Sequence, residues 1–112
     1  MVYYFKFEAQ PAERNRYYGR IGYGEADVFV SGDRCNNDLG IMETVARAYI
    51  DAQAWVATNL VEIHATNDPA PDWDTELMVL YQRALQSGVS GFFVAAPDSD
   101  IPGGPVLRVR PY

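Results

Sequence analysis

The sequence predicts an α+β protein in which two helices pack on a mixed sheet of four or five strands. The predicted order is ββαβαβ, with or without a last strand. Two observations lead to this class: segments with alternating apolar and polar residues are interleaved with segments of helical apolar spacing, and clusters of Gly, Pro, Asn and Asp separate them. With 112 residues, we expect one domain that spans residues 1–112.

The first two strands are predicted from alternation and from their aromatic and β-branched residues. Residues 2–9 form the first strand and residues 20–31 the second, and a polar segment at residues 10–18 joins them as an antiparallel hairpin. In the second strand, alternation places Ala26, Val28 and Val30 on one face and Glu25, Asp27 and Phe29 on the other.

The first helix is predicted within residues 38–58, where apolar residues cover more than one face. Asn36, Asn37 or Asp38 can cap its start. Its end falls near Thr58, or earlier if the β-prone Trp55 and Val56 leave the helix. One apolar stripe consists of Leu39, Met42, Ala46, Tyr49 and Ile50, and a second of Ile41, Val45, Ala48 and Ala52. A helix with two such stripes needs cover on two sides, from the sheet on one side and from a partner subunit or a ligand on the other. We predict a homodimer whose interface contains the second stripe.

The third strand is predicted from the alternation in residues 60–66. This alternation places Val61, Ile63 and Ala65 on one face and Leu60, Glu62 and His64 on the other. Asp72 or Asp74 caps the second helix, which Gly88 ends. Its apolar stripe consists of Leu77, Leu80, Tyr81, Ala84 and Leu85. The apolar run in residues 89–96 predicts a strand covered on both faces, and residues 106–109 predict a short edge strand.

Composition excludes several partners. The net charge of −6 argues against nucleic acid and anionic membranes, because both bind a surface rich in Lys and Arg. No apolar run reaches membrane-spanning length and the start does not resemble a signal peptide, so we expect a cytoplasmic protein. The single Cys35 cannot form an internal disulfide, which agrees with a reducing compartment.

Residues 45–56 read Val-Ala-Arg-Ala-Tyr-Ile-Asp-Ala-Gln-Ala-Trp-Val. Together with the aromatic first strand and the Val-rich second strand, this segment resembles small α+β proteins of unknown function that are carried on bacterial mobile gene cassettes of the integron type. The pattern favours Gly before the Trp, where this chain has Ala54. The resemblance implies a bacterial origin and an α+β fold, and it implies no activity.

His64 is the candidate for acid–base chemistry because an imidazole titrates near neutral pH, and Glu62 on the same strand face could orient it. The alternative is a solvated surface histidine.

Cys35 is a candidate nucleophile, because it lies at a predicted helix start. The alternative is a small turn residue without a chemical role. One Cys and one His cannot build a usual zinc site in one subunit. The acidic loops at residues 33–38, 68–76 and 98–104 lack the ligand spacing of an EF-hand. We expect neither a metal nor a cofactor.

Three functions compete. The first is a homodimeric binding or accessory protein without its own catalytic centre. The second is an acidic immunity- or inhibitor-type protein that masks a basic protein partner through charge complementarity. The third is a small enzyme that uses His64 with Glu62. Composition favours the first two because both work without a catalytic constellation.

Overall fold

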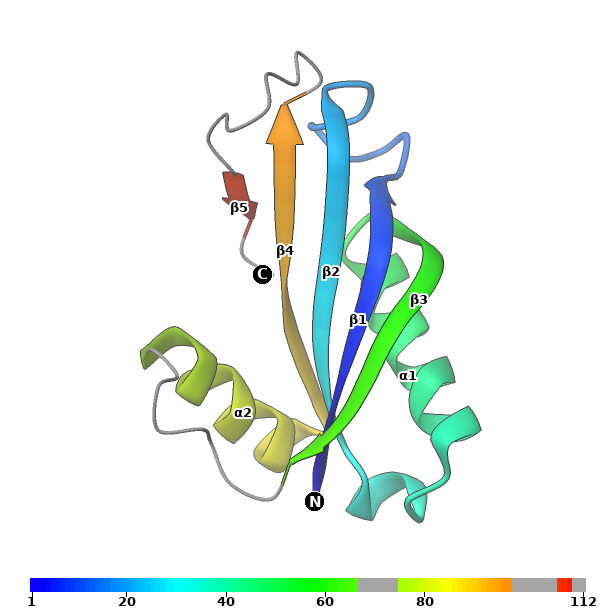
Figure 1. The fold of residues 1–112 in the computed structure, drawn as a ribbon, viewed down its shortest axis with the longest axis vertical. Helices are drawn as coiled ribbons and strands as arrows, with labels where there is room; N and C mark the ends of the chain where they lie inside the picture. The colour runs from blue at the N-terminus through cyan, green and yellow to red at the C-terminus, as the bar shows by residue number, and fades with distance from the viewer. Residues whose placement is uncertain (67–74, 98–106, 110–112) are drawn as a thin grey trace.

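The computed structural model describes residues 1–66, 75–97 and 107–109 (Figure 1). The elements are β1 (Val2–Pro11), β2 (Ile21–Ser31), the 3-10 helix η1 (Asp33–Cys35), α1 (Leu39–Ala52), β3 (Trp55–Thr66), α2 (Thr75–Ser87), β4 (Val89–Pro97) and β5 (Leu107–Val109). The strands form one sheet in the order β3-β1-β2-β4-β5. The predicted α+β class and element order are confirmed.

Every pairing between the described strands is antiparallel, so the expectation of a mixed sheet is wrong. A helical connection joins β2 to β3, and such connections often link parallel neighbours. Here β1 occupies the position between the two strands. β2 and β3 therefore run in the same direction without pairing, because each is antiparallel to β1.

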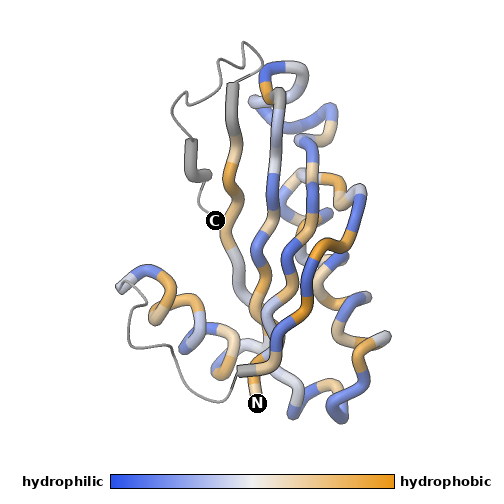
Figure 2. The backbone as a smooth tube through the Cα atoms, viewed as in Figure 1, coloured by the Kyte–Doolittle hydropathy of each residue, from blue (hydrophilic) through white to orange (hydrophobic). Residues whose placement is uncertain are grey.

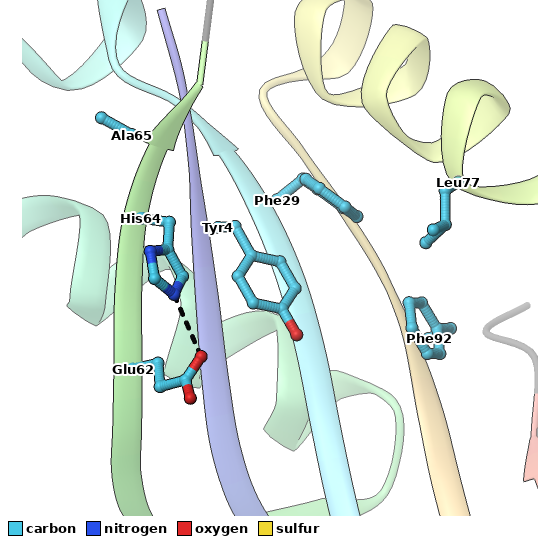
Figure 3. A pocket seen from close by; sticks show the side chains of 7 residues that line it. All are labelled: Tyr4, Phe29, Glu62, His64, Ala65, Leu77 and Phe92. Atoms are coloured by element: carbon cyan, nitrogen blue, oxygen red, sulfur yellow. Dashed lines mark hydrogen bonds and ion pairs between the residues drawn. The ribbon is translucent and has the colours of Figure 1, made fainter. Parts of the chain in front are cut away.

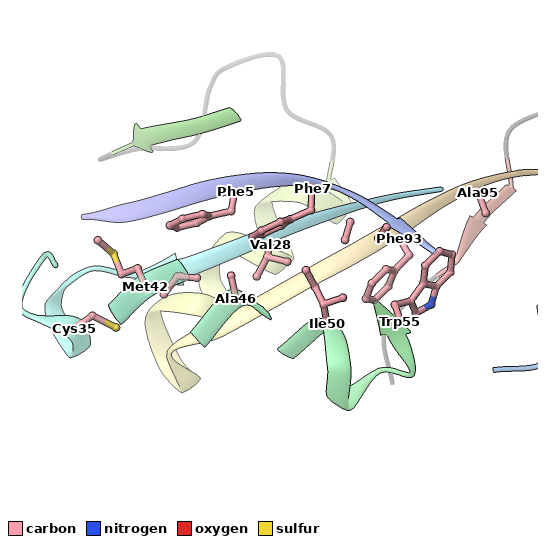
Figure 4. Close-up of a cluster of buried hydrophobic side chains, with 13 residues drawn as sticks. Phe5, Phe7, Val28, Cys35, Met42, Ala46, Ile50, Trp55, Phe93 and Ala95 are labelled. Carbon is pink, nitrogen blue, oxygen red and sulfur yellow. The ribbon is translucent and has the colours of Figure 1, made fainter. Parts of the chain in front are cut away.

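α1 covers one face of the sheet. The Ile41 amide donates a hydrogen bond of 3.1 Å to Asp38 Oδ1, which makes Asp38 the cap among the three candidates and satisfies a free helix donor. Leu39 was expected in the core stripe but is 49% exposed. The core between α1 and the sheet, drawn in Figure 4, contains the buried residues Phe5, Phe7, Ala9, Ala26, Val28, Val30, Cys35, Met42, Ala46, Ile50, Trp55, Phe93 and Ala95.

α1 ends at Ala52. Of the two predicted ends, the one near Thr58 is wrong, and the earlier one, at which Trp55 and Val56 leave the helix, is confirmed. Ala54 then adopts a left-handed conformation with φ 64°, which reverses the chain direction, and β3 begins at Trp55. The Trp55 ring is 1% exposed and stacks on Phe93 with the ring centroids 4.8 Å apart. Burial of this large ring and the pairing of β3 with β1 both favour an early end of the helix.

Two irregularities interrupt the pairing of β3 with β1. At one of them Phe7 pairs with Leu60 and Lys6 with Glu62, which leaves Val61 as an extra residue in a β-bulge. The bulge places Leu60 against the core beneath α1. The prediction that Leu60 shares a face with Glu62 and His64 is therefore wrong, because simple alternation fails across an extra residue.

α2 packs on the opposite face, over one end of the sheet (Figure 1). The buried residues on this side are Val2, Phe29, Leu80, Tyr81, Ala84 and Phe92. Phe92 and Phe93 belong to the two opposite cores, which confirms β4 as a strand covered on both faces. Leu85, expected in the stripe, is 40% exposed, and Gly88 ends α2 with φ 100°.

No helix in the described part of the chain is long and apolar enough to cross a membrane.

The remainder of the face that carries α2 is polar. Along β1, β2 and β3, hydrophilic and hydrophobic residues alternate in Figure 2, and the register brings the hydrophilic positions together across strands. Lys6 pairs with Asp27 on β2 and with Glu62 on β3, and Glu8 pairs with Glu25. One face of the sheet is thus closed by α1, while the other is apolar under α2 and acidic beyond it.

Candidate functional site

A cavity of about 430 Å³ lies where the apolar and acidic halves of this face meet. Its lining residues come from β1, β2, β3, α2 and β4, which bring together positions far apart in the sequence. They are Tyr4, Phe29, Glu62, His64, Ala65, Leu77 and Phe92. Figure 3 shows Glu62 and His64 on one side of Tyr4, and Phe29, Leu77 and Phe92 on the other.

Tyr4 is at the centre of this arrangement because β1 lies between β2 and β3. It pairs with Phe29 on one side and with His64 on the other. The Tyr4 ring is 5.4 Å from the Phe29 ring, tilted against it, and stacks on the His64 imidazole with centroids 6.1 Å apart. Tyr4 therefore joins the apolar wall of the pocket to its polar wall.

His64 and Glu62 form the pair that alternation predicted. His64 Nε2 lies 3.0 Å from Glu62 Oε2, and both side chains project from the same face of β3. The His64 side chain is 64% exposed and that of Glu62 is 47% exposed. The contact with Glu62 can orient the His64 imidazole at the pocket wall.

Asp27 lies beneath this surface, and no pattern in the sequence singles it out as a site residue. It is 1% exposed, and the Tyr4 hydroxyl donates a hydrogen bond to its Oδ1. Among the described residues, Oδ2 of Asp27 is a buried oxygen without a hydrogen-bond donor. An ionised carboxylate in this position would be costly, because an unpaired buried charge loses its hydration.

A proton shared by the carboxyl groups of Asp27 and Glu25 removes the need for an unpaired buried charge. Burial, followed by the hydrogen bond with Glu25, raises the pKa of Asp27 to about 8. Burial of Glu25 acts in the same direction, but hydrogen bonds from Asp27 and Tyr23 hold the pKa of Glu25 below its usual value. At neutral pH Asp27 is therefore the protonated partner, and its hydroxyl donates to the Glu25 carboxylate. Lys6 Nζ lies 3.5 Å from Glu25 Oε1 and balances that charge.

The residues predicted for a dimer interface lie on α1, on the face of the sheet opposite the pocket. Ile41, Ala48 and Ala52 are exposed, while Val45 is half-buried and packs against the core. The second stripe of α1 thus contains three outward positions and one that contributes to the core.

The other candidate residues lie away from the pocket. Cys35 is 6% exposed and belongs to the core beneath α1. In the part of the chain that is described, no group of three or more His, Cys, Asp or Glu side chains could hold a metal ion. Most of the acidic loop at residues 68–76 and all of the loop at residues 98–104 fall outside the described residues.

Comparison of the chain with protein-family models, with curated proteins and with solved structures gave no significant match.

Proposed function

We propose that this protein binds a compact organic molecule in the pocket around Tyr4, and that it does so as a homodimeric binding protein. The cavity itself supports this function. Its volume of about 430 Å³ falls within the range of small-molecule sites, which combine mostly apolar walls with a few polar groups.

The two walls differ in chemistry, and this difference would orient a ligand. Phe29, Leu77 and Phe92 offer aromatic and aliphatic surface, whereas Glu62 and His64 offer charge and hydrogen bonds. A molecule with an apolar body and one polar end matches this division. Burial of the apolar body would contribute about 25 cal/mol per Å² of surface removed from water.

The homodimer in this proposal rests on α1. Ile41 is 48% exposed and Leu39 is 49% exposed, so the outer side of the helix retains large apolar groups. α1 and the pocket lie on opposite faces of the sheet, because the buried residues of α1 belong to one core cluster and Phe29 and Phe92 of the pocket belong to the other. Association through α1 would therefore leave the pocket open.

The ligand site is tested by filling the cavity. Leu77 is half-buried and lines the pocket, so Leu77→Trp would occupy part of the space. We expect 2-phenylethanol, a probe with an aromatic body and a hydroxyl end, to bind the wild-type protein with a millimolar dissociation constant. In ¹H–¹⁵N NMR spectra, the amides of residues 4, 62, 64 and 77 should shift. Leu77→Trp should weaken this binding at least several-fold.

The matched control is Leu85→Trp, which places the same ring on an exposed position of α2 and should leave probe binding unchanged. Absence of concentration-dependent shifts in the wild-type protein would contradict the proposed site. So would shifts confined to α1, because they would place the probe on the other face.

A further inference from the structure

We propose that the ligand of this pocket is an organic cation, namely a compact amine whose ammonium group lies against Glu62 and Tyr4 and whose apolar body lies against Phe29, Leu77 and Phe92. This inference rests on the proposed function and specifies the class of molecule. It follows from the charges around the cavity and from the faces of its aromatic rings.

The charges on this side favour a cation. The described lining residues include one carboxylate, Glu62, and no lysine or arginine. Lys6, the single lysine of the sequence, is already paired with Glu25. The charge of Glu62 also acts at the neighbouring Tyr4, where it is the smallest of the effects that raise the pKa, after burial, Asp27 and Glu25. An anion would meet this negative potential without a free positive partner.

The polar wall of the pocket offers hydrogen-bond acceptors, so it also favours a ligand that carries donor hydrogens. The Tyr4 hydroxyl hydrogen is engaged by Asp27, so the Tyr4 oxygen can only accept from a ligand. Glu62 is an acceptor as well, and His64 occupies one of its oxygens. An ammonium group carries three donor hydrogens and can satisfy both acceptors.

The aromatic rings add a second attraction for a cation. The faces of Tyr and Phe rings carry negative charge density, which attracts an ammonium group within about 6 Å of the ring centre. Tyr4 lies between the carboxylate and the apolar wall (Figure 3). A cation beside Glu62 would therefore lie next to an aromatic ring, while the attached carbon chain extends toward Phe29 and Phe92.

Three probes of nearly equal shape separate the charge classes: 2-phenylethylamine (a cation at pH 7), 2-phenylethanol (neutral) and phenylacetate (an anion). Each is titrated into the full chain and followed by NMR. We expect 2-phenylethylamine to bind about tenfold more tightly than 2-phenylethanol, and phenylacetate to bind more weakly than both. Added NaCl should weaken only the binding of the amine, because salt screens charge.

Glu62→Gln keeps the shape of the side chain and removes its charge. It should lower the affinity for 2-phenylethylamine about fivefold, as expected for a partly solvated ion pair, and leave that for 2-phenylethanol unchanged. Glu13→Gln makes the same charge change at an exposed position of the loop after β1 and should alter neither.

The outcomes distinguish the two proposals. If 2-phenylethanol or phenylacetate binds the pocket as tightly as the amine, the cation class is overturned while the ligand site stands. An unchanged amine affinity in Glu62→Gln also overturns it. If none of the three probes shifts the pocket resonances, the proposed function fails, and the inference about its ligand fails with it.

Discussion

At the residue scale, Asp27 links folding to pH. Its pKa is raised to about 8 in the folded protein, against about 3.9 in an unfolded chain. Between these values the native state binds a proton that the unfolded state has lost, so this residue makes the free energy of unfolding fall as pH rises through that window. Glu25 acts elsewhere, because its lowered pKa affects stability only as pH falls below its ordinary range.

We expect Asp27→Asn to remove this pH dependence. The amide of Asn mimics a protonated carboxyl, since it can donate to Glu25 and accept from the Tyr4 hydroxyl. In urea denaturation, the wild-type protein should lose at least about 1.4 kcal/mol more stability than the variant between pH 5 and pH 9, equivalent to one pKa unit. Parallel pH profiles for the two proteins would show that Asp27 is ionised throughout.

At the element scale, residue patterns predicted which elements form, and local geometry determined where they end. Alternation correctly separated Val28 and Val30 from Asp27 and Phe29, because a strand without bulges keeps its period of two. The same rule misplaced Leu60, since the bulge at Val61 is set by pairing with β1 and leaves no composition signal. The sequence left two ends open for α1, because Ala54 is an uncommon residue for a left-handed conformation and so does not mark the chain reversal at that position.

Ala54→Gly should stabilise the protein. With φ 64°, Ala54 has a steric cost in the folded state that glycine avoids. This cost is larger than the conformational entropy that glycine, with its greater flexibility in the unfolded chain, loses on folding. We expect a gain of about 1 kcal/mol, or about 4 °C in Tm, measured by thermal denaturation.

Ala48→Gly provides the control of opposite sign. Ala48 is an exposed position inside α1, where glycine costs about 1 kcal/mol relative to alanine. If Ala54→Gly destabilises the protein as much as Ala48→Gly does, residue 54 has ordinary helical geometry. The helix would then continue toward Thr58.

At the scale of the whole molecule, the sheet order decides which parts of the site the sequence could reveal. Glu62 and His64 are two residues apart on one strand, so their common face was predictable from the chain alone. Tyr4, Asp27 and Leu77 join them only through the order β3-β1-β2-β4 and through the placement of α2. Periodicity assigns residues to faces but does not identify neighbouring strands, so the pocket could not be predicted.

The division of the sheet into a face with the pocket and a face closed by α1 also locates the proposed dimer contact. Ile41 is 48% exposed and lies in the first turn of α1, where a carboxylate interacts favourably with the helix dipole. Ile41→Asp should therefore leave the Tm of the isolated subunit nearly unchanged. If Ile41 contacts a second copy, the same change would bury an unpaired charge.

We expect size-exclusion chromatography with light scattering to give the mass of a dimer for the wild-type protein at tens of micromolar and that of a monomer for Ile41→Asp. Leu85→Asp makes the same charge change on α2, at a position 40% exposed, and should remain dimeric because α2 lies on the pocket face. A monomeric wild-type protein would refute the homodimer. Dissociation of Leu85→Asp, with Ile41→Asp still dimeric, would move the interface to α2, where it would compete with ligand entry.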